Sequence, residues 1–151
     1  NRLASNSLLE AVVTATRAAS DASGRQSAGG RKSVEIPPWD PCGATDSDEE
    51  VVISQNWDEL RRTMWNYVGI VRSNKRLDRA LRRIMLLKEE IGEYYWNFTI
   101  TSNLIELRNI ALVAELVVRC AMARRESRGL HYTIDYPEAD EGARRDTVMT
   151  I

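Results

Sequence analysis

Three stretches of the chain carry apolar residues at alternating three- and four-residue steps, the spacing that aligns side chains on one face of a helix. Short connections separate them, at Ser73-Asn74 and at Trp96 to Ser102. Three helices joined in this way favour an antiparallel three-helix bundle. The stripes are Trp57, Leu60, Met64, Tyr67 and Val71; Leu77, Ala80, Ile84, Leu87, Ile91 and Tyr94; and Leu104, Leu107, Ala111, Ala114, Val118 and Ala121.

The third stretch is apolar on its other faces as well. Between Ile110 and Val118 the only charged residue is Glu115, which predicts a helix buried nearly all round. Asn103 and Glu106 have the spacing of a capping box and predict the start of this helix. Arg119 follows Glu115 by four residues, so the two side chains are expected to pair along the helix.

The first third of the chain is less regular. A capping box and an apolar face predict a helix over Ser7–Ala19, and the Gly- and Ser-containing stretch Ser20–Ser33 predicts a flexible linker. Pro37–Pro41 is typical of a stiff extended segment, and the acidic run Asp46–Glu50 of a solvated loop. We expect the first bundle helix to start near Asn56.

Beyond Gly129 the helical pattern gives way to alternation, in the order His131, Tyr132, Thr133, Ile134, Asp135, Tyr136. This predicts an extended tail, with a polar and mobile end over residues 140–151. The predicted fold class is therefore all-α: an antiparallel three-helix bundle preceded by one helix and followed by an extended C-terminal tail.

Composition narrows the class of protein. The 151 residues are 43% apolar and 28% charged, which is typical of one soluble domain, and no apolar run is long enough to span a bilayer. The net charge of −1 argues against a chain that coats nucleic acid. Two cysteines, Cys42 and Cys120, are too few for a disulfide scaffold and indicate a reducing, cytoplasmic location. The chain begins without Met, which suggests a piece of a longer protein.

Few residues could carry chemistry. The sequence has no Gly-rich phosphate loop, no metal-ligand cluster and no nucleophile–base pair. His131 is the only histidine, and a lone histidine is more often structural than catalytic. One face of the second helix is basic, and we interpret it as solvated or as a docking surface rather than as a nucleic-acid site, because no aromatic residues are interleaved with its cations. Its residues are Lys75, Arg76, Arg79, Arg82 and Arg83.

Several motifs occur in an order that points to a family. Asn1–Glu10 resembles the last segment of the FAD-binding domain in the L-aspartate oxidase family, a branch of the succinate dehydrogenase and fumarate reductase flavoproteins. Trp57–Arg72 resembles the oxidase branch in particular. Glu126–His131 and Asp135–Pro137 resemble the wider family. The resemblance covers nearly the whole chain except the linker and the last dozen residues.

The resemblance implies an activity and a set of site residues. The family oxidises L-aspartate to iminoaspartate with FAD at the start of bacterial NAD biosynthesis, oxygen or fumarate reoxidises the flavin, and the product passes to quinolinate synthase. It also implies that Arg2 binds a substrate carboxylate and that the backbone of Ser7 and Leu8 meets the flavin. It implies no catalytic residue and no metal site within this stretch.

The same resemblance divides the chain. Residues 1–20 would end the FAD-binding domain, residues 21–53 would link it to the bundle at residues 54–128, and residues 129–151 would form the tail. The remaining FAD-binding and capping domains would lie upstream, so we expect the isolated chain to be inactive. Arg128 and His131 would dock the bundle and its tail onto the FAD-binding domain.

Two alternatives stay open. A succinate dehydrogenase or fumarate reductase flavoprotein subunit shares the Asn1–Glu10 segment and Glu126–Gly129, although Trp57–Arg72 favours the oxidase. The other is an isolated helical interaction module, which a pull-down with the bundle alone would test.

Overall fold

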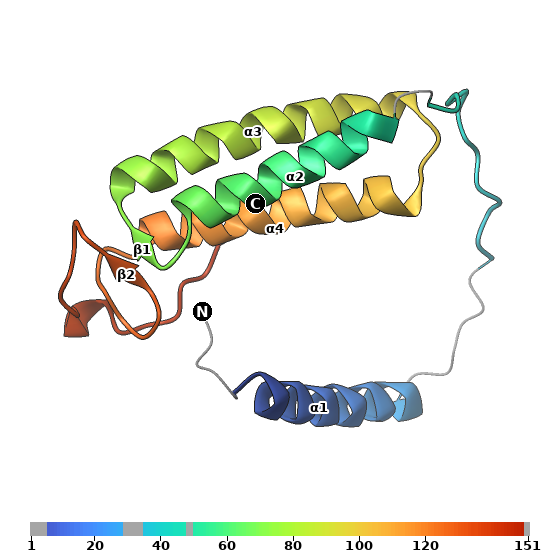
Figure 1. Ribbon diagram of the computed structural model, residues 1–151. Helices are drawn as coiled ribbons and strands as arrows, with labels where there is room; N and C mark the ends of the chain where they lie inside the picture. The colour runs from blue at the N-terminus through green and yellow to red at the C-terminus, as the bar shows by residue number, and fades with distance from the viewer. Residues whose placement is uncertain (1–5, 29–34, 48–49, 150–151) are drawn as a thin grey trace. The chain divides into compact units, whose positions relative to one another are not determined.

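The computed structural model describes residues 6–28, 35–47 and 50–149, and it separates the chain into two compact units, Asn1–Asp40 and Pro41–Ile151. The described residues form four α-helices, two short strands and a 3-10 turn, whose arrangement within each unit can be followed in Figure 1. The elements are α1 (Asn6–Ala28), α2 (Glu50–Tyr67), β1 (Val71–Arg72), α3 (Asn74–Asn97), α4 (Ser102–Ala123), β2 (Tyr132–Thr133) and η1 (Glu141–Ala143).

The helix α1 is longer than the sequence pattern predicts. It continues nine residues past Ala19, so the prediction of a flexible linker is wrong for Ser20–Ala28, while residues 29–34 lie outside the described part. Two alanines in the extension, Ala22 and Ala28, favour the helix, whereas Gly24 costs about 1 kcal/mol. Asp21 and Arg25 also pair along the helix at 2.8 Å.

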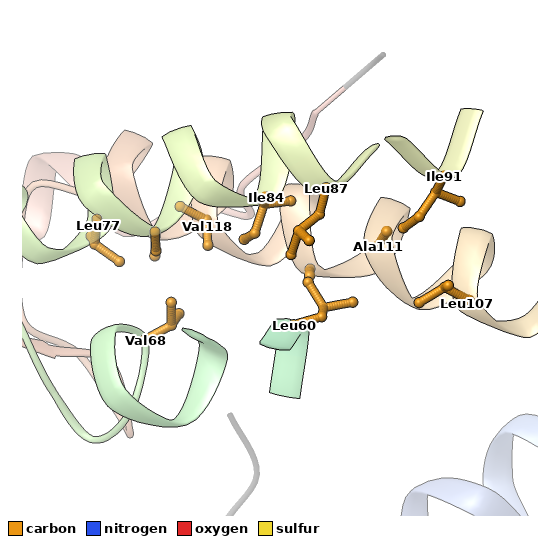
Figure 2. Close-up of a cluster of buried hydrophobic side chains, with 12 residues drawn as sticks. Leu60, Val68, Leu77, Ile84, Leu87, Ile91, Leu107, Ala111 and Val118 are labelled. Carbon is orange, nitrogen blue, oxygen red and sulfur yellow. The ribbon is translucent and has the colours of Figure 1, made fainter. Parts of the chain in front are cut away.

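The second unit is built on three helices that run up, down and up. In Figure 1, α3 returns alongside α2, and α4 returns alongside α3, as short connections require. Side chains from all three helices meet in one apolar core, which Figure 2 shows in close-up. Its buried members are Leu60, Val68, Leu77, Ala80, Ile84, Leu87, Ile91, Leu107, Ala111, Ala114, Val118 and Ala121. The predicted all-α bundle is therefore confirmed.

The predicted stripes differ in accuracy. Every residue of the stripes on α3 and α4 is buried. Of the predicted stripe that begins on α2, only Leu60 is buried, and Val71 lies in β1 with 46% of its surface exposed. The helix ends at Tyr67, two residues before Gly69, so Val71 lies outside the helix.

Two helix starts were predicted at the wrong residues. The helix α2 begins at Glu50 rather than near Asn56, and so takes in the end of the acidic run. The cap of α4 is Thr101 and not Asn103, because the Thr101 hydroxyl accepts the backbone N–H of Leu104 at 3.3 Å. At α3 the predicted break holds: Ser73 is the cap and accepts the N–H of Arg76 at 3.3 Å.

The helix α4 is not buried all round as its composition predicts. Val113 and Val117 are 57% and 40% exposed and line an open groove of about 830 Å³ between α2 and α4. Trp57, Met64 and Trp65 form the α2 side of the groove. Within the described part of the second unit, α2 and α3 pack against α4 and leave this apolar face of α4 open.

The tail is tied to the bundle by a two-stranded parallel sheet. Val71 of β1 is paired with Tyr132 of β2, and Arg72 with Thr133. Parallel strands need a long crossover connection, and here α3 and α4 together supply it. Figure 1 shows the sheet at the end of the bundle where α2 ends, α3 begins and α4 ends.

Candidate functional site

The residues implied to meet substrate and flavin lie at the start of the chain. Arg2 falls outside the described residues. Ser7 and Leu8 belong to the first turn of α1, and both are exposed in the unit that contains them. The first turn of an α-helix has backbone N–H groups without partners inside the helix, and the turn of α1 carries no acidic side chain that would repel an anion.

The basic face of α3 is largely occupied by local contacts. Arg82 pairs with Asp78, one turn earlier on the same helix. Arg83 reaches Glu59 of α2 at 3.3 Å, and the Arg79 guanidinium lies 5.7 Å from the centroid of the Tyr67 ring. Because acidic and aromatic neighbours on α2 and α3 face these cations, the arrangement favours the interpretation as a solvated face over a nucleic-acid site.

The strongest cluster of charged side chains lies where the tail leaves the bundle. We call it the tail junction, and it comprises Arg72, Arg124, Glu126, Arg128 and His131. Its residues come from β1, from the segment that follows α4, and from the turn before β2. Glu126 and His131 are buried, although neither belongs to a helix.

Glu126 is the centre of the tail junction. Its carboxylate accepts hydrogen bonds from Arg124 Nη1 at 2.5 Å, from Arg128 Nε at 3.0 Å and from the backbone N–H of Asp140 at 2.9 Å. Burial alone would raise the pKa of Glu126, but the Asp140 N–H and the two guanidinium groups hold that pKa below its ordinary value. The carboxylate is thus kept charged and fixes the tail to the end of α4.

His131 bridges two parts of the chain that are far apart in sequence. Arg72 Nη1 lies 2.9 Å from His131 Nδ1, and His131 Nε2 lies 3.2 Å from the carbonyl oxygen of Arg124. The imidazole is only 4% exposed. Within its own unit the enclosed His131 side chain joins the tail to the bundle, while the docking of Arg128 and His131 onto the FAD-binding domain stays a prediction.

A compact turn brings His131 into this position. The backbone N–H and C=O groups of Arg128 and His131 are paired with each other at 2.9 and 3.1 Å, and Gly129 between them has a φ of +60°, which glycine adopts without strain. The Ser127 hydroxyl accepts the N–H of Thr133 at 3.0 Å and donates to the carbonyl of Tyr136 at 2.7 Å. These bonds define the path of the tail past β1.

The chemistry of the tail junction is structural. Within the described residues, no group of three or more His, Cys, Asp or Glu side chains is placed to hold a metal ion. Nor does any helix there combine the length and the apolar character needed to cross a bilayer. Guanidinium and carboxylate groups in buried pairs position a chain.

A lone histidine indicates a structural role, which the buried contacts of His131 support, but the sequence pattern does not reveal its partners Arg72 and Arg124. Arg72 directly follows the run Val68 to Val71, and Glu126 is acidic within the basic segment Arg124–Arg128. These two positions were the available signals. Each becomes informative only once the fold brings β1 next to the tail.

Comparison with known proteins identifies the class. Residues 57–150 match the protein family described as fumarate reductase flavoprotein C-term, which covers the bundle and the tail junction together. Since the match takes in more than half of the chain, this protein belongs to that family of flavoprotein C-terminal domains.

Individual relatives are more specific, and they show that the chain is homologous to the C-terminal region of L-aspartate oxidases. It is 58% identical over 150 residues to the L-aspartate oxidase of Acinetobacter baylyi and 58% identical over 149 residues to that of Pseudomonas aeruginosa. Each of these comparisons covers 99% of this chain and 27% of the relative. The chloroplastic L-aspartate oxidase of Oryza sativa is 39% identical over 166 residues, which cover 99% of this chain and 25% of that enzyme. The chain thus spans about a quarter of the length of the relatives it matches.

Proposed function

We propose that this chain is the C-terminal part of an L-aspartate oxidase, an FAD-dependent enzyme that oxidises L-aspartate to iminoaspartate in NAD biosynthesis. The observation that supports this most strongly is the 58% identity to two bacterial L-aspartate oxidases over 99% of the chain. The electron acceptor would be oxygen or fumarate, the product would pass to quinolinate synthase, and the enzyme would be cytoplasmic.

The start of α1 fits a role beside the flavin. The helix has 23 residues, so its N–H groups and aligned peptide dipoles give the first turn a partial positive charge. No acidic side chain in that turn opposes the field, and Ser7 and Leu8 lie in it. When bound, the flavin would accept two electrons from the amino acid and pass them to the acceptor. Ser7 and Leu8 would hold the pyrimidine side of the ring by backbone N–H groups, which stabilise negative charge.

Arg2 would bind a carboxylate of the substrate. A guanidinium group is planar and always charged, and it can hold a carboxylate by two parallel hydrogen bonds. Arg2 precedes the first residue of α1 by four positions, so substrate and flavin contacts would come from one short segment. The bundle and the tail junction would supply support rather than reacting groups.

The test uses the full-length protein that contains this chain. Purified with its flavin, it should turn over L-aspartate and should fail to oxidise succinate. The isolated 151-residue chain should neither retain FAD on gel filtration nor oxidise aspartate, because one helix terminus contributes only about 0.3–1 kcal/mol toward a negative charge. Oxidation of succinate but not of aspartate by the full-length protein would overturn the proposal.

The second candidate is a succinate dehydrogenase or fumarate reductase flavoprotein subunit. The family match over residues 57–150, which carries the fumarate reductase description, favours it. Assays of the full-length protein with L-aspartate and with succinate would distinguish this candidate from the oxidase.

A further inference from the structure

The hydrogen bonds of His131 determine which ring nitrogen carries the proton. Arg72 has only donors, so Nδ1, which lies 2.9 Å from Arg72 Nη1, must accept and cannot bear a proton. Nε2 lies 3.2 Å from the Arg124 carbonyl oxygen, which can only accept, so Nε2 carries the hydrogen. The closed tail junction therefore requires a neutral imidazole with its hydrogen on Nε2.

The charged groups that face the ring make protonation costly. Arg72 approaches from β1, Arg124 from the end of α4, and Glu126 from the segment after it. Burial lowers the pKa of His131 below its usual value, and the charges of Arg72 and Arg124 lower it further. The Arg124 carbonyl and the Glu126 carboxylate act in the opposite direction without reversing the shift.

The tail can separate from the bundle without opening the core. All members of the buried core cluster lie between Leu60 and Ala121, so none belongs to the tail. The tail is held instead by polar contacts: the N–H of Ile134 donates to the Arg72 carbonyl at 3.0 Å, and Asp135 Oδ2 accepts the N–H of Asn74 at 2.6 Å. Because these contacts lie outside the apolar core, they can break while the three helices stay packed.

We propose that His131 is an acid-sensitive latch: a proton on Nδ1 removes the acceptor for Arg72 and releases β2 and the tail from β1 while the three helices stay packed. The release does not depend on the proposed catalytic function. It would give the unit two states, with the tail closed at neutral pH and open in mild acid.

The direction of the pH dependence follows from proton binding. A histidine with a depressed pKa binds fewer protons in the closed state than in the open state, so closing is favoured more as the pH rises. The closing energy supplied by His131 is fully present above about pH 6.5, the ordinary pKa of the group, and declines as the pH falls toward the lowered pKa.

The test is a pH titration of the 151-residue chain by NMR, since His131 is its only imidazole. At pH 7.5 the ring nitrogen shifts should report an unprotonated Nδ1 and a protonated Nε2. On acidification the ring should titrate with a midpoint below 6.5. The backbone amide signals of Thr133, Ile134 and Tyr136 should move with the same midpoint, while those of Leu87 and Val118 should stay in place.

His131→Gln is the matched control. A glutamine can accept from Arg72 and donate to the Arg124 carbonyl, as the neutral ring does, but it does not titrate. In this variant the tail amides should stay at their closed positions through the pH range in which the wild-type tail moves. If the tail amide signals of His131→Gln move with the same pH midpoint as in the wild type, the release is caused by carboxylate groups and the proposal is overturned.

Arg72→Gln gives a second readout in case the glutamine variant does not fold. It keeps a donor toward Nδ1 but removes the facing positive charge, so the ring midpoint should rise. A ring that titrates in the wild type without any shift of the Thr133 and Ile134 amides would also overturn the proposal.

Discussion

Glu115 and Arg119 are one turn apart on α4, and Arg119 Nε donates to Glu115 Oε1 at 2.6 Å. The pairing that the four-residue spacing predicts is thus confirmed. The structure adds a partner that the spacing does not show, because Lys88 of α3 donates to the other carboxylate oxygen. Glu115 is almost fully buried, so one acidic side chain joins two helices at the edge of the apolar core.

Glu115→Gln should lower the stability of the second unit at pH 7 and flatten its response to acid. The hydrogen bond from Lys88 lowers the pKa of Glu115, burial opposes this, and Arg119 lowers the pKa again. For a depressed carboxylate, the stabilisation is present above its unfolded pKa, near 4.5, and is lost as the pH falls through the lower folded value. Urea unfolding followed by circular dichroism between pH 3 and pH 7 would measure this.

The control for Glu115 is Glu89→Gln, which changes an exposed glutamate on α3 and should leave the urea midpoint almost unchanged at every pH. The prediction fails if Glu115→Gln and wild type have equal midpoints at pH 7. A double variant, Lys88→Met with Glu115→Leu, should regain part of the loss, since apolar pairs often replace buried ion pairs without cost.

Thr101→Ala should destabilise the unit by about 1 kcal/mol, the usual cost of losing a capping oxygen. Asn103→Ala should cost much less, because the cap of α4 is Thr101 and its hydroxyl accepts from Leu104. The two variants, compared by chemical denaturation, separate the observed cap from the predicted one. If Asn103→Ala loses as much unfolding free energy as Thr101→Ala, or more, then Asn103 is the cap, as the sequence pattern predicts.

Gly129→Ala should destabilise the turn before β2 by about 1–2 kcal/mol, because φ is +60° there and a Cβ disfavours that conformation. Gly92→Ala is the opposite case on the same unit. Gly92 lies inside α3 with open space around the missing Cβ, so alanine should stabilise by roughly 0.5–1 kcal/mol. Thermal unfolding should show a lower melting temperature for Gly129→Ala and a higher one for Gly92→Ala. A lower melting temperature for Gly92→Ala would contradict the second prediction.

Arg2→Leu in the full-length protein should raise the KM for aspartate and lower kcat/KM by about ten- to more than a hundredfold. A charged hydrogen bond lost from a buried site costs roughly 1.5–3 kcal/mol. Arg2→Lys should recover part of the loss, because the charge returns without the two-pronged geometry. Flavin content should stay near normal in both variants. If Arg2→Leu oxidises aspartate with unchanged kinetics, Arg2 does not bind the substrate.

The bundle could be predicted from the sequence because the spacing of apolar residues within each helix shows which face is buried. Leu77 to Tyr94 and Leu104 to Ala121 repeat at helical spacing, and each of those stripes is buried as predicted. The end of α1 could not be predicted in the same way, because a segment of Ser, Ala and charged residues with one glycine is compatible with both a helix and a linker. Only the balance of propensity and pairing, as at Asp21 and Arg25, decides between them.

The tail junction was beyond reach for a different reason. Arg72 and His131 are 59 residues apart, and no local spacing links them. The sequence marks His131 as a lone histidine and Glu126 as part of a family motif, but their contacts depend on where α4 ends relative to β1. The roles implied for Ser7 and Leu8 stay predictions, and so does that for Arg2.

The parallel pair of β1 and β2 also constrains the order of folding. Val71 and Arg72 are synthesised before the helical hairpin that must fold back to bring Tyr132 and Thr133 to them. Closing so long a loop is entropically unfavourable until α3 and α4 are packed, after which the ends already lie together. Strand pairing should therefore be the last event in the folding of this unit. Protection of the Ile134 amide from hydrogen exchange would then be found only in chains whose three helices have already assembled.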